Sequence, residues 1–349
     1  MEFCTHLSMD YKERSYGGER IYRDMIEQAV LADRSGFDAV SVTEHHLVNL
    51  GMMPATLMSV VKLAAHTQKV KIITAVAVLP LHDMRSYAGE VIVADIFTEG
   101  RMILGVGRGA YAFEMERFGV PMDETREKFD ESLDVLTTLL REEEVAWKGK
   151  YYNFDALTVM PRPRRRGGPD MLMAALHPEA IYHSTKRGFH ILTTPLHGDR
   201  AHLVAQVDAF RRARDEMGEA GAHLTLMLSR AAFVTRSEKD RRQKVELAND
   251  FFARFDNVYT GPGIVDAGMA RVLPRKQTLA ELEQNLLICT PQEMTDKLGE
   301  YADLGIDRVS LTMNFGASQA DTLESTRAVA EEVIPHFRST SMKKTAELV

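Results

Sequence analysis

Short apolar runs alternate with longer amphipathic segments along most of the chain. The first amphipathic segment, at 19–35, carries Ile21, Met25, Ala29 and Ala32 on one helical stripe, and Gly36 follows it as a helix-ending residue. A β-branched run at 38–43 comes next and reads as a strand that is buried on both faces. This alternation of strand and helix is typical of βα units around a parallel sheet.

The same pattern, followed to the end of the chain, predicts eight strands, most of them followed by a helix. The strands are expected at 2–6, 38–43, 70–78, 102–107, 171–175, 189–193, 224–234 and 308–314. The helices are expected at 19–35, 54–66, 85–97, 123–140, 178–187, 199–217, 238–254, 279–287, 291–304 and 318–336. With 349 residues, this order predicts an α/β fold, a (β/α)8 TIM barrel with insertions, with a doubly wound open sheet as the alternative. We expect one domain at 1–338 and a flexible tail at 339–349.

Two segments interrupt the alternation. Residues 145–163 include a short hairpin turning at Lys148-Gly149, followed by a basic loop at 161–169. Residues 257–278 are rich in glycine and proline and have no apolar period. Because loops of that length inside a domain are usually functional or mobile, we expect a mobile lid over the barrel mouth.

Composition narrows the class of protein. Lys and Arg total 43 against 50 Asp and Glu, a formal net charge of −7, which argues against nonspecific binding to nucleic acid. Two cysteines exclude a disulfide framework and a cysteine-rich metal site. The sequence shows neither a secretory signal nor an apolar run long enough to span a membrane. We therefore expect a cytoplasmic protein with a core of ordinary size.

The carboxyl ends of the strands are where a barrel of this type carries its chemistry. The second predicted strand ends in Glu44-His45-His46, and adjacent side chains at a strand end point in opposite directions. One histidine would face the mouth and exchange protons, while the other packs behind it. Surface histidines on a polar strand end are the alternative. The pair lacks the spacing of a metal site, so no metal is expected.

Two further strand ends carry candidate anion-binding groups. The fourth strand ends in the glycine-rich sequence GVGRG at 105–109, which includes Gly107 and Arg108 but lacks the ending of a Walker motif. The fifth is followed by His177 and by Pro178, which opens a helix whose free amides suit a phosphate. Tight turns and an ordinary helix start explain these features equally well.

Several of these segments together resemble the bacterial luciferase-like flavin monooxygenases. They are GFDAVSVTEHHL at 36–47, ITAVAVLPLH at 73–82, EGRMILGVGRGAYAFEMERFGV at 99–120, GKYYNF at 149–154 and PEAIYHSTKRGF at 178–189. Their order and spacing match the family over nearly the whole chain. Each segment is weak evidence alone, but the EHH and GVGRG segments are specific when they occur together.

The resemblance implies a TIM barrel that uses O2 and reduced FMN, supplied by a separate NAD(P)H-dependent flavin reductase. A flavin hydroperoxide would oxygenate a small organic substrate. By motif match, His45 is the catalytic histidine and His46 its neighbour, Ala75 and Val76 lie beneath the isoalloxazine, often at a cis peptide, and Arg108 binds the phosphate. Many relatives hold the phosphate with small hydroxyl residues where this chain has Leu176 and His177. Backbone amides and Arg108 would then suffice, or His177 replaces a hydroxyl.

The resemblance leaves two alternatives open. A deazaflavin-dependent dehydrogenase or reductase of the same superfamily transfers hydride without O2, and a noncatalytic partner subunit of the luciferase type would dispense with His45. Relatives form dimers through their second and third helices, so we expect a homodimer across 54–66 and 85–97. These helices carry Leu57, Val60, Val61, Ala64, Val91, Ile92 and Ala94. The mouth is expected to be lined by methionine and aromatic residues, namely Met9, Met52, Met53, Tyr111 and Phe113.

Overall fold

Eight parallel strands close into a barrel in the computed structural model, which describes residues 1–196 and 200–338. In order around the barrel they are β1 (Glu2–His6), β2 (Ala39–Val42), β3 (Lys71–Thr74), β5 (Met102–Gly107), β8 (Asp170–Ala174), β9 (His190–Thr193), β10 (Leu226–Val234) and β14 (Arg308–Thr312). Strand β14 pairs with β1 through Glu2 opposite Arg308 and closes the ring. The predicted TIM barrel is confirmed, and the open sheet is excluded.

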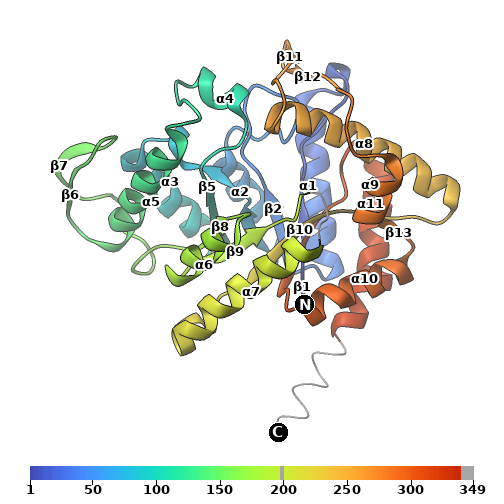
Figure 1. Ribbon diagram of the computed structural model, residues 1–349. Helices are drawn as coiled ribbons and strands as arrows, with labels where there is room; N and C mark the ends of the chain where they lie inside the picture. Colours follow the sequence, from blue (N-terminus) through green and yellow to red (C-terminus); the bar gives the residue numbers. More distant parts are fainter. Residues whose placement is uncertain (197–199, 339–349) are drawn as a thin grey trace, which may run out of the picture.

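Helices surround this barrel (Figure 1). They are α1 (Gly18–Ser35), α2 (Thr56–Ala64), α3 (Met84–Phe97), α5 (Thr125–Arg141), α6 (Pro178–Lys186), α7 (Arg200–Met217), α8 (Glu238–Tyr259), α10 (Pro291–Leu304) and α11 (Gln319–Ala328), with a π-helical turn at Val329–Val333. Asp199 and the predicted tail at 339–349 lie outside the described residues. In the described ranges, no helix combines the length and the apolar character needed to cross a bilayer.

The strands are apolar on both faces because each face meets a different core. The barrel interior holds a small cluster of Cys4, Ala39, Ile73, Ile103, Leu172 and Met227. The outward faces pack against the helices in a much larger core, in which α1 contributes Ile21, Met25, Ala29 and Ala32, as its stripe predicts. Gly36 ends α1 in the left-handed conformation, with φ of 95°, and its amide bonds back to Ala32.

The third predicted strand is not continuous. The expected run at 70–78 divides into β3 and a two-residue strand, β4 (Ala77–Val78), on either side of a cis peptide bond between Ala75 and Val76. Two other short elements were missed, α4 (Ala112–Arg117) and β13 (Leu287–Cys289). The predicted helix at 279–287 is present as α9 (Leu279–Asn285), and β13 begins where that helix was expected to end. Elements of a few residues span too little of a period to be recognised in sequence.

Two hairpins extend from the barrel. The predicted one forms from β6 (Val145–Lys148) and β7 (Asn153–Leu157). The other, β11 (Val265–Asp266) with β12 (Met269–Ala270), lies within the expected lid segment, whose first residues belong instead to α8. Asn49, after β2, accepts a hydrogen bond from the amide of Ala270 at 2.8 Å. This hairpin and α4 lie at the same end of the molecule, at the top of Figure 1.

The apolar residues expected to face a partner subunit are in fact mostly in the core of their own barrel. Leu57, Val60, Ala64, Val91, Ile92 and Ala94 are buried there. The outward faces of the same helices carry a different apolar set, in which Met58 is 74% exposed and Phe97 is 63% exposed, with Val93 and Ile96 on α3. The apolar stripe assigned to the partner was the wrong one, because the stronger stripe of each helix covers the sheet.

Candidate active site

A cavity of about 230 Å³ opens at the carboxyl ends of the barrel strands. Its floor and walls come from the barrel strands and the segments that follow them: His6, Ser8, Asp10, Thr43, His45, Ala75, Leu192, Thr194, Ser229, Arg230, Ser310 and Thr312. Helix α8 adds Phe251, Phe252 and Phe255. The cavity therefore combines an aromatic wall with a polar floor, at the end where barrel enzymes place their chemistry.

His45 stands in the wall of this cavity and is held on several sides. Its Nδ1 lies 3.2 Å from Oε2 of Glu114, which is buried on α4. The ring of Tyr111 stacks on the imidazole with centroids 3.9 Å apart and planes 6° from parallel. Gly51 approaches so closely that a Cβ there would lie 2.8 Å from the imidazole Cδ2. With Nδ1 engaged, Nε2 is the nitrogen that has no hydrogen-bond partner among residues 1–196 and 200–338.

His46 points away from the cavity, as the alternation at a strand end predicts. Its Nε2 bonds to Oε1 of Glu44 at 2.9 Å, and its ring meets Phe118 edge-on. Its backbone amide donates to the second carboxylate oxygen of Glu114 at 2.9 Å. The Glu114 carboxylate thus holds the side chain of His45 and the backbone amide of His46, but only His45 lines the cavity.

Glu44 is the buried centre of a second network behind the cavity wall. It is 1% exposed and accepts hydrogen bonds from His46, from His82 at 2.9 Å and from the amide of Val78 at 2.8 Å. Burial alone would raise the pKa of Glu44, but the bonds from His46 and His82 lower it overall. The hydrogen bond to Glu44 raises the pKa of His46. Glu44 therefore fastens the end of β2 to the segment that follows β4.

Of the residues predicted to hold a flavin, one lines the cavity and the others lie at the carboxyl ends of neighbouring strands. Ala75 lines it, and the bond to Val76 is cis, as the resemblance implies. A Cβ on Gly107 would lie 2.6 Å from the Val76 side chain, so only glycine fits at the end of β5. Arg108 and His177 follow β5 and β8, which are paired neighbours, so both lie at the same edge of the barrel.

The side chains of Arg108 and His177 form no hydrogen bond or ion pair with any described residue. Arg108 is exposed and forms no ion pair with any described residue. His177 is the N-cap residue of α6, and its side chain makes no capping bond there. The first amides of α6 and the guanidinium of Arg108 are therefore available to an anion such as a phosphate.

Sequence reasoning missed some residues of the cavity and misplaced others. Met9 and Met53 are buried in the core, and of the five residues expected at the mouth only Tyr111 lines the cavity. Glu114 was not singled out, although it follows GVGRG in the connection between β5 and α5, which must lie at the catalytic end of a barrel. The aromatic wall comes from α8, more than 200 residues from His45 in sequence, and no local pattern indicates that contact.

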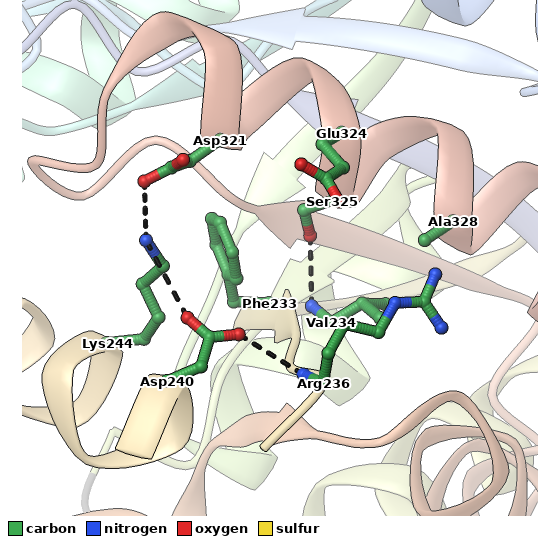
Figure 2. A pocket seen from close by; sticks show the side chains of 9 residues that line it. All are labelled: Phe233, Val234, Arg236, Asp240, Lys244, Asp321, Glu324, Ser325 and Ala328. Atoms are coloured by element: carbon green, nitrogen blue, oxygen red, sulfur yellow. Dashed lines mark hydrogen bonds and ion pairs between the residues drawn. The ribbon is translucent and has the colours of Figure 1, made fainter. Parts of the chain in front are cut away.

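A second, smaller cavity of about 70 Å³ lies outside the barrel, between the end of β10, α8 and α11 (Figure 2). Its charged side chains neutralise one another. Lys244 reaches Asp321 at 2.6 Å and Asp240 at 4.0 Å, and the amide of Val234 donates to Ser325 at 2.9 Å. The Lys244–Asp321 pair ties α8 to α11 and the Val234–Ser325 bond ties β10 to α11, so this cavity is a structural junction.

The fold is that of the luciferase-like monooxygenases. The model of that family, "Luciferase-like monooxygenase", matches residues 1–308, and the chain belongs to it. Among curated proteins, the oxygenase component of the flavin-dependent trigonelline monooxygenase of Acinetobacter baylyi is 26% identical over 99% of this chain and 98% of its own length. The chain is thus an enzyme of a family of flavin-dependent monooxygenases.

Solved structures agree on the fold but differ in cofactor. A monooxygenase from Streptomyces bottropensis superposes with a TM-score of 0.84 and 23% identity, over 97% of this chain and 100% of its own. The oxygenating constituent of the 3,6-diketocamphane monooxygenase of Pseudomonas putida, in complex with FMN, has a TM-score of 0.77 and 18% identity over 96% and 98%. An F420-dependent secondary alcohol dehydrogenase reaches 0.76 with 18% identity over the same shares. At these identities, the similarity to the solved structures shows the fold alone.

Proposed function

We propose that this chain is the oxygenase of a two-component monooxygenase that uses O2 and reduced FMN to oxygenate a small organic substrate. The observation that carries the proposal is the position of His45, clamped between Glu114, Tyr111 and Gly51 in the wall of the cavity. The relative from Acinetobacter is named an oxygenase component, which supports a separate NAD(P)H-dependent flavin reductase as the functional partner.

The described residues fit FMN. Ala75 in the cavity wall, with Val76 next to it in the chain, would lie beneath a flat ring, and Gly107 leaves room for the Val76 side chain. The guanidinium of Arg108 provides a cation for the phosphate. The free amides at the start of α6, whose N-cap residue is His177, provide hydrogen-bond donors. When bound, the reduced flavin supplies the electrons that activate O2.

His45 carries the proton chemistry in this proposal. Its Nε2 holds or transfers a proton at the reacting oxygen, while the Glu114 carboxylate fixes the proton on Nδ1 and stabilises the imidazolium. Phe251, Phe252 and Phe255 exclude water from the same space. His46 bonds to Glu44 behind the wall, so its role here is to position the end of β2.

We also propose a homodimer. Its contact surface would be the outward face of α2 and α3, where Met58, Val93, Ile96 and Phe97 are exposed. An isologous contact buries such a patch on both copies at once and removes these apolar side chains from water.

The test is an anaerobic titration of the protein with reduced FMN and, separately, with reduced F420, followed by mixing with O2 and a panel of organic compounds. The expected result is binding of reduced FMN and product that forms only when O2 is present. Substrate oxidation or reduction that proceeds with F420 and without O2 would instead establish the deazaflavin alternative. Binding of flavin without turnover of any compound, together with full activity on adding a homologous subunit, would indicate a noncatalytic partner.

A further inference from the structure

One buried arginine of the cavity has no role in the chemistry described so far. Arg230 lies on β10, lines the cavity and is only 8% exposed. Its Nη2 donates to the backbone carbonyl of Asn285, at the end of α9. Its Nε–H is buried and has no hydrogen-bond partner within residues 1–196 and 200–338. Buried donors are rarely left unpaired, and a buried guanidinium least of all, because its desolvation is costly.

The charge of Arg230 also has no counter-ion. In the part of the chain that the structure describes, no carboxylate forms an ion pair with it. The cavity does contain one acidic residue, Asp10, but that carboxylate is occupied elsewhere. It accepts hydrogen bonds from the hydroxyl of Ser8 and from the amide of Gly51.

Asp10 has its own cationic neighbour as well. Burial raises the pKa of Asp10, and Arg254 on α8 counteracts that effect by attraction. The same attraction to Asp10 opposes the lowering of the pKa of Arg254 by burial. Arg254 therefore offsets part of the charge of Asp10 without forming an ion pair with it, and among the described residues no carboxylate pairs with Arg230 in the cavity wall.

The surroundings of Arg230 indicate what kind of anion would fit. The three phenylalanines of α8 line the same cavity and offer an aromatic surface. Ser229 and Thr312 add hydroxyls to the lining of the cavity. A ligand that satisfies all these groups has a flat or apolar body and one carboxylate, since a carboxylate oxygen accepts a charge-assisted hydrogen bond from a guanidinium N–H.

We propose that Arg230 determines substrate specificity by binding the carboxylate of an organic acid through its Nε–H. The inference rests on the proposed function only in naming the bound acid a substrate. The reaction itself does not require the carboxylate, which orients the body of the molecule against the aromatic wall.

Calorimetric titration of the flavin-free protein with benzoate and with its neutral analogue benzamide tests this proposal. The expected result is that benzoate binds about tenfold or more tightly than benzamide, because charge-assisted bonds are about twice as strong as neutral ones. Arg230→Met should remove this preference and Arg230→Lys should restore part of it. Arg236→Met is the matched control, because Arg236 is an exposed arginine just beyond β10 that pairs with Glu332. It removes the same charge and should leave benzoate binding unchanged.

Three outcomes overturn the proposal. They are equal affinity for benzoate and benzamide in the wild type, benzoate binding that survives Arg230→Met, and loss of benzoate binding in Arg236→Met to the same degree. A parallel titration with reduced FMN separates this inference from the proposed function. If Arg230→Met weakens flavin binding and leaves the benzoate preference intact, Arg230 serves the flavin and the substrate assignment is wrong. Benzoate selectivity without any flavin binding would instead refute the proposed cofactor alone.

Discussion

Replacing Glu114 by glutamine tests the proposed chemistry at one atom. The carboxylate accepts from Nδ1 of His45 at 3.2 Å and from the amide of His46 at 2.9 Å. A glutamine keeps one carbonyl oxygen, so the bond from the His46 amide can persist. The amide nitrogen of the glutamine would then face His45, and its N–H can donate a hydrogen bond to Nδ1 only if Nδ1 carries no proton. The substitution therefore moves the proton of neutral His45 from Nδ1 to Nε2 and removes the negative charge beside the ring.

The expected decrease in rate follows from the loss of the unprotonated Nε2 of His45. If His45 acts through a free Nε2, the wrong tautomer removes most of its acid–base contribution, which is typically about 10²–10⁴ in rate. The structure itself should change little, because an amide replaces a carboxylate of the same shape. The net value of one hydrogen bond is about 1 kcal/mol, so we expect a correspondingly small loss of stability.

The assay is product formed per reduced FMN consumed, with thermal unfolding measured in parallel. Glu114→Gln should bind reduced FMN nearly as the wild type does but release hydrogen peroxide in place of product. The ¹⁵N shifts of His45 should report the change of tautomer. Glu116→Gln is the matched control, since Glu116 lies on the same short helix α4 with its side chain exposed. Wild-type coupling in Glu114→Gln, despite a changed tautomer, would refute the role assigned to the Glu114–His45 pair.

Three further predictions follow from other parts of the molecule. Arg108→Ala should weaken FMN binding by roughly tenfold to a hundredfold, as expected for a lost bond to a charged group, and leave riboflavin binding unchanged; equal losses in fluorescence titrations would remove the phosphate assignment. Phe97→Asp should convert the proposed dimer to a monomer in sedimentation at micromolar concentration, whereas a wild type that is already monomeric contradicts the interface. Burial, aided by repulsion from His45, lowers the pKa of His6 to about 4. As the pH falls, His6 takes up a proton in the unfolded chain before it does so in the folded protein. The free energy of unfolding therefore decreases between about pH 6.5 and about pH 4, by up to about 3 kcal/mol. Denaturant unfolding should therefore show His6→Asn gaining stability relative to the wild type between pH 7 and pH 4.5, and a difference that does not vary with pH would refute the buried, neutral state of His6.

The position of the site could be predicted from sequence, but its composition only in part. Barrel enzymes carry their chemistry at strand ends, so Glu44-His45-His46 and GVGRG indicated the edge of the barrel at which the structure has its cavity. Their alternation also predicted that the two histidines diverge, and the structure shows this divergence. Glu114 lies on a six-residue helix that no periodicity could reveal, although its place after GVGRG offered a signal.

The sequence by itself determined the barrel, because each βα unit is encoded locally. The stripe of α1, the capping Gly36 and the apolar strand at Met102–Gly107 are properties of consecutive residues, and chain order then fixes the order of parallel strands. The tertiary structure alone decided which side chains meet. Arg230 lines the same cavity as His45 because closure of the barrel brings β10 and β2 to one ring. Helix α8, which follows β10 in the chain, supplies the aromatic wall. Such contacts depend on the register and tilt of the whole ring, to which no single segment contributes more than a small part.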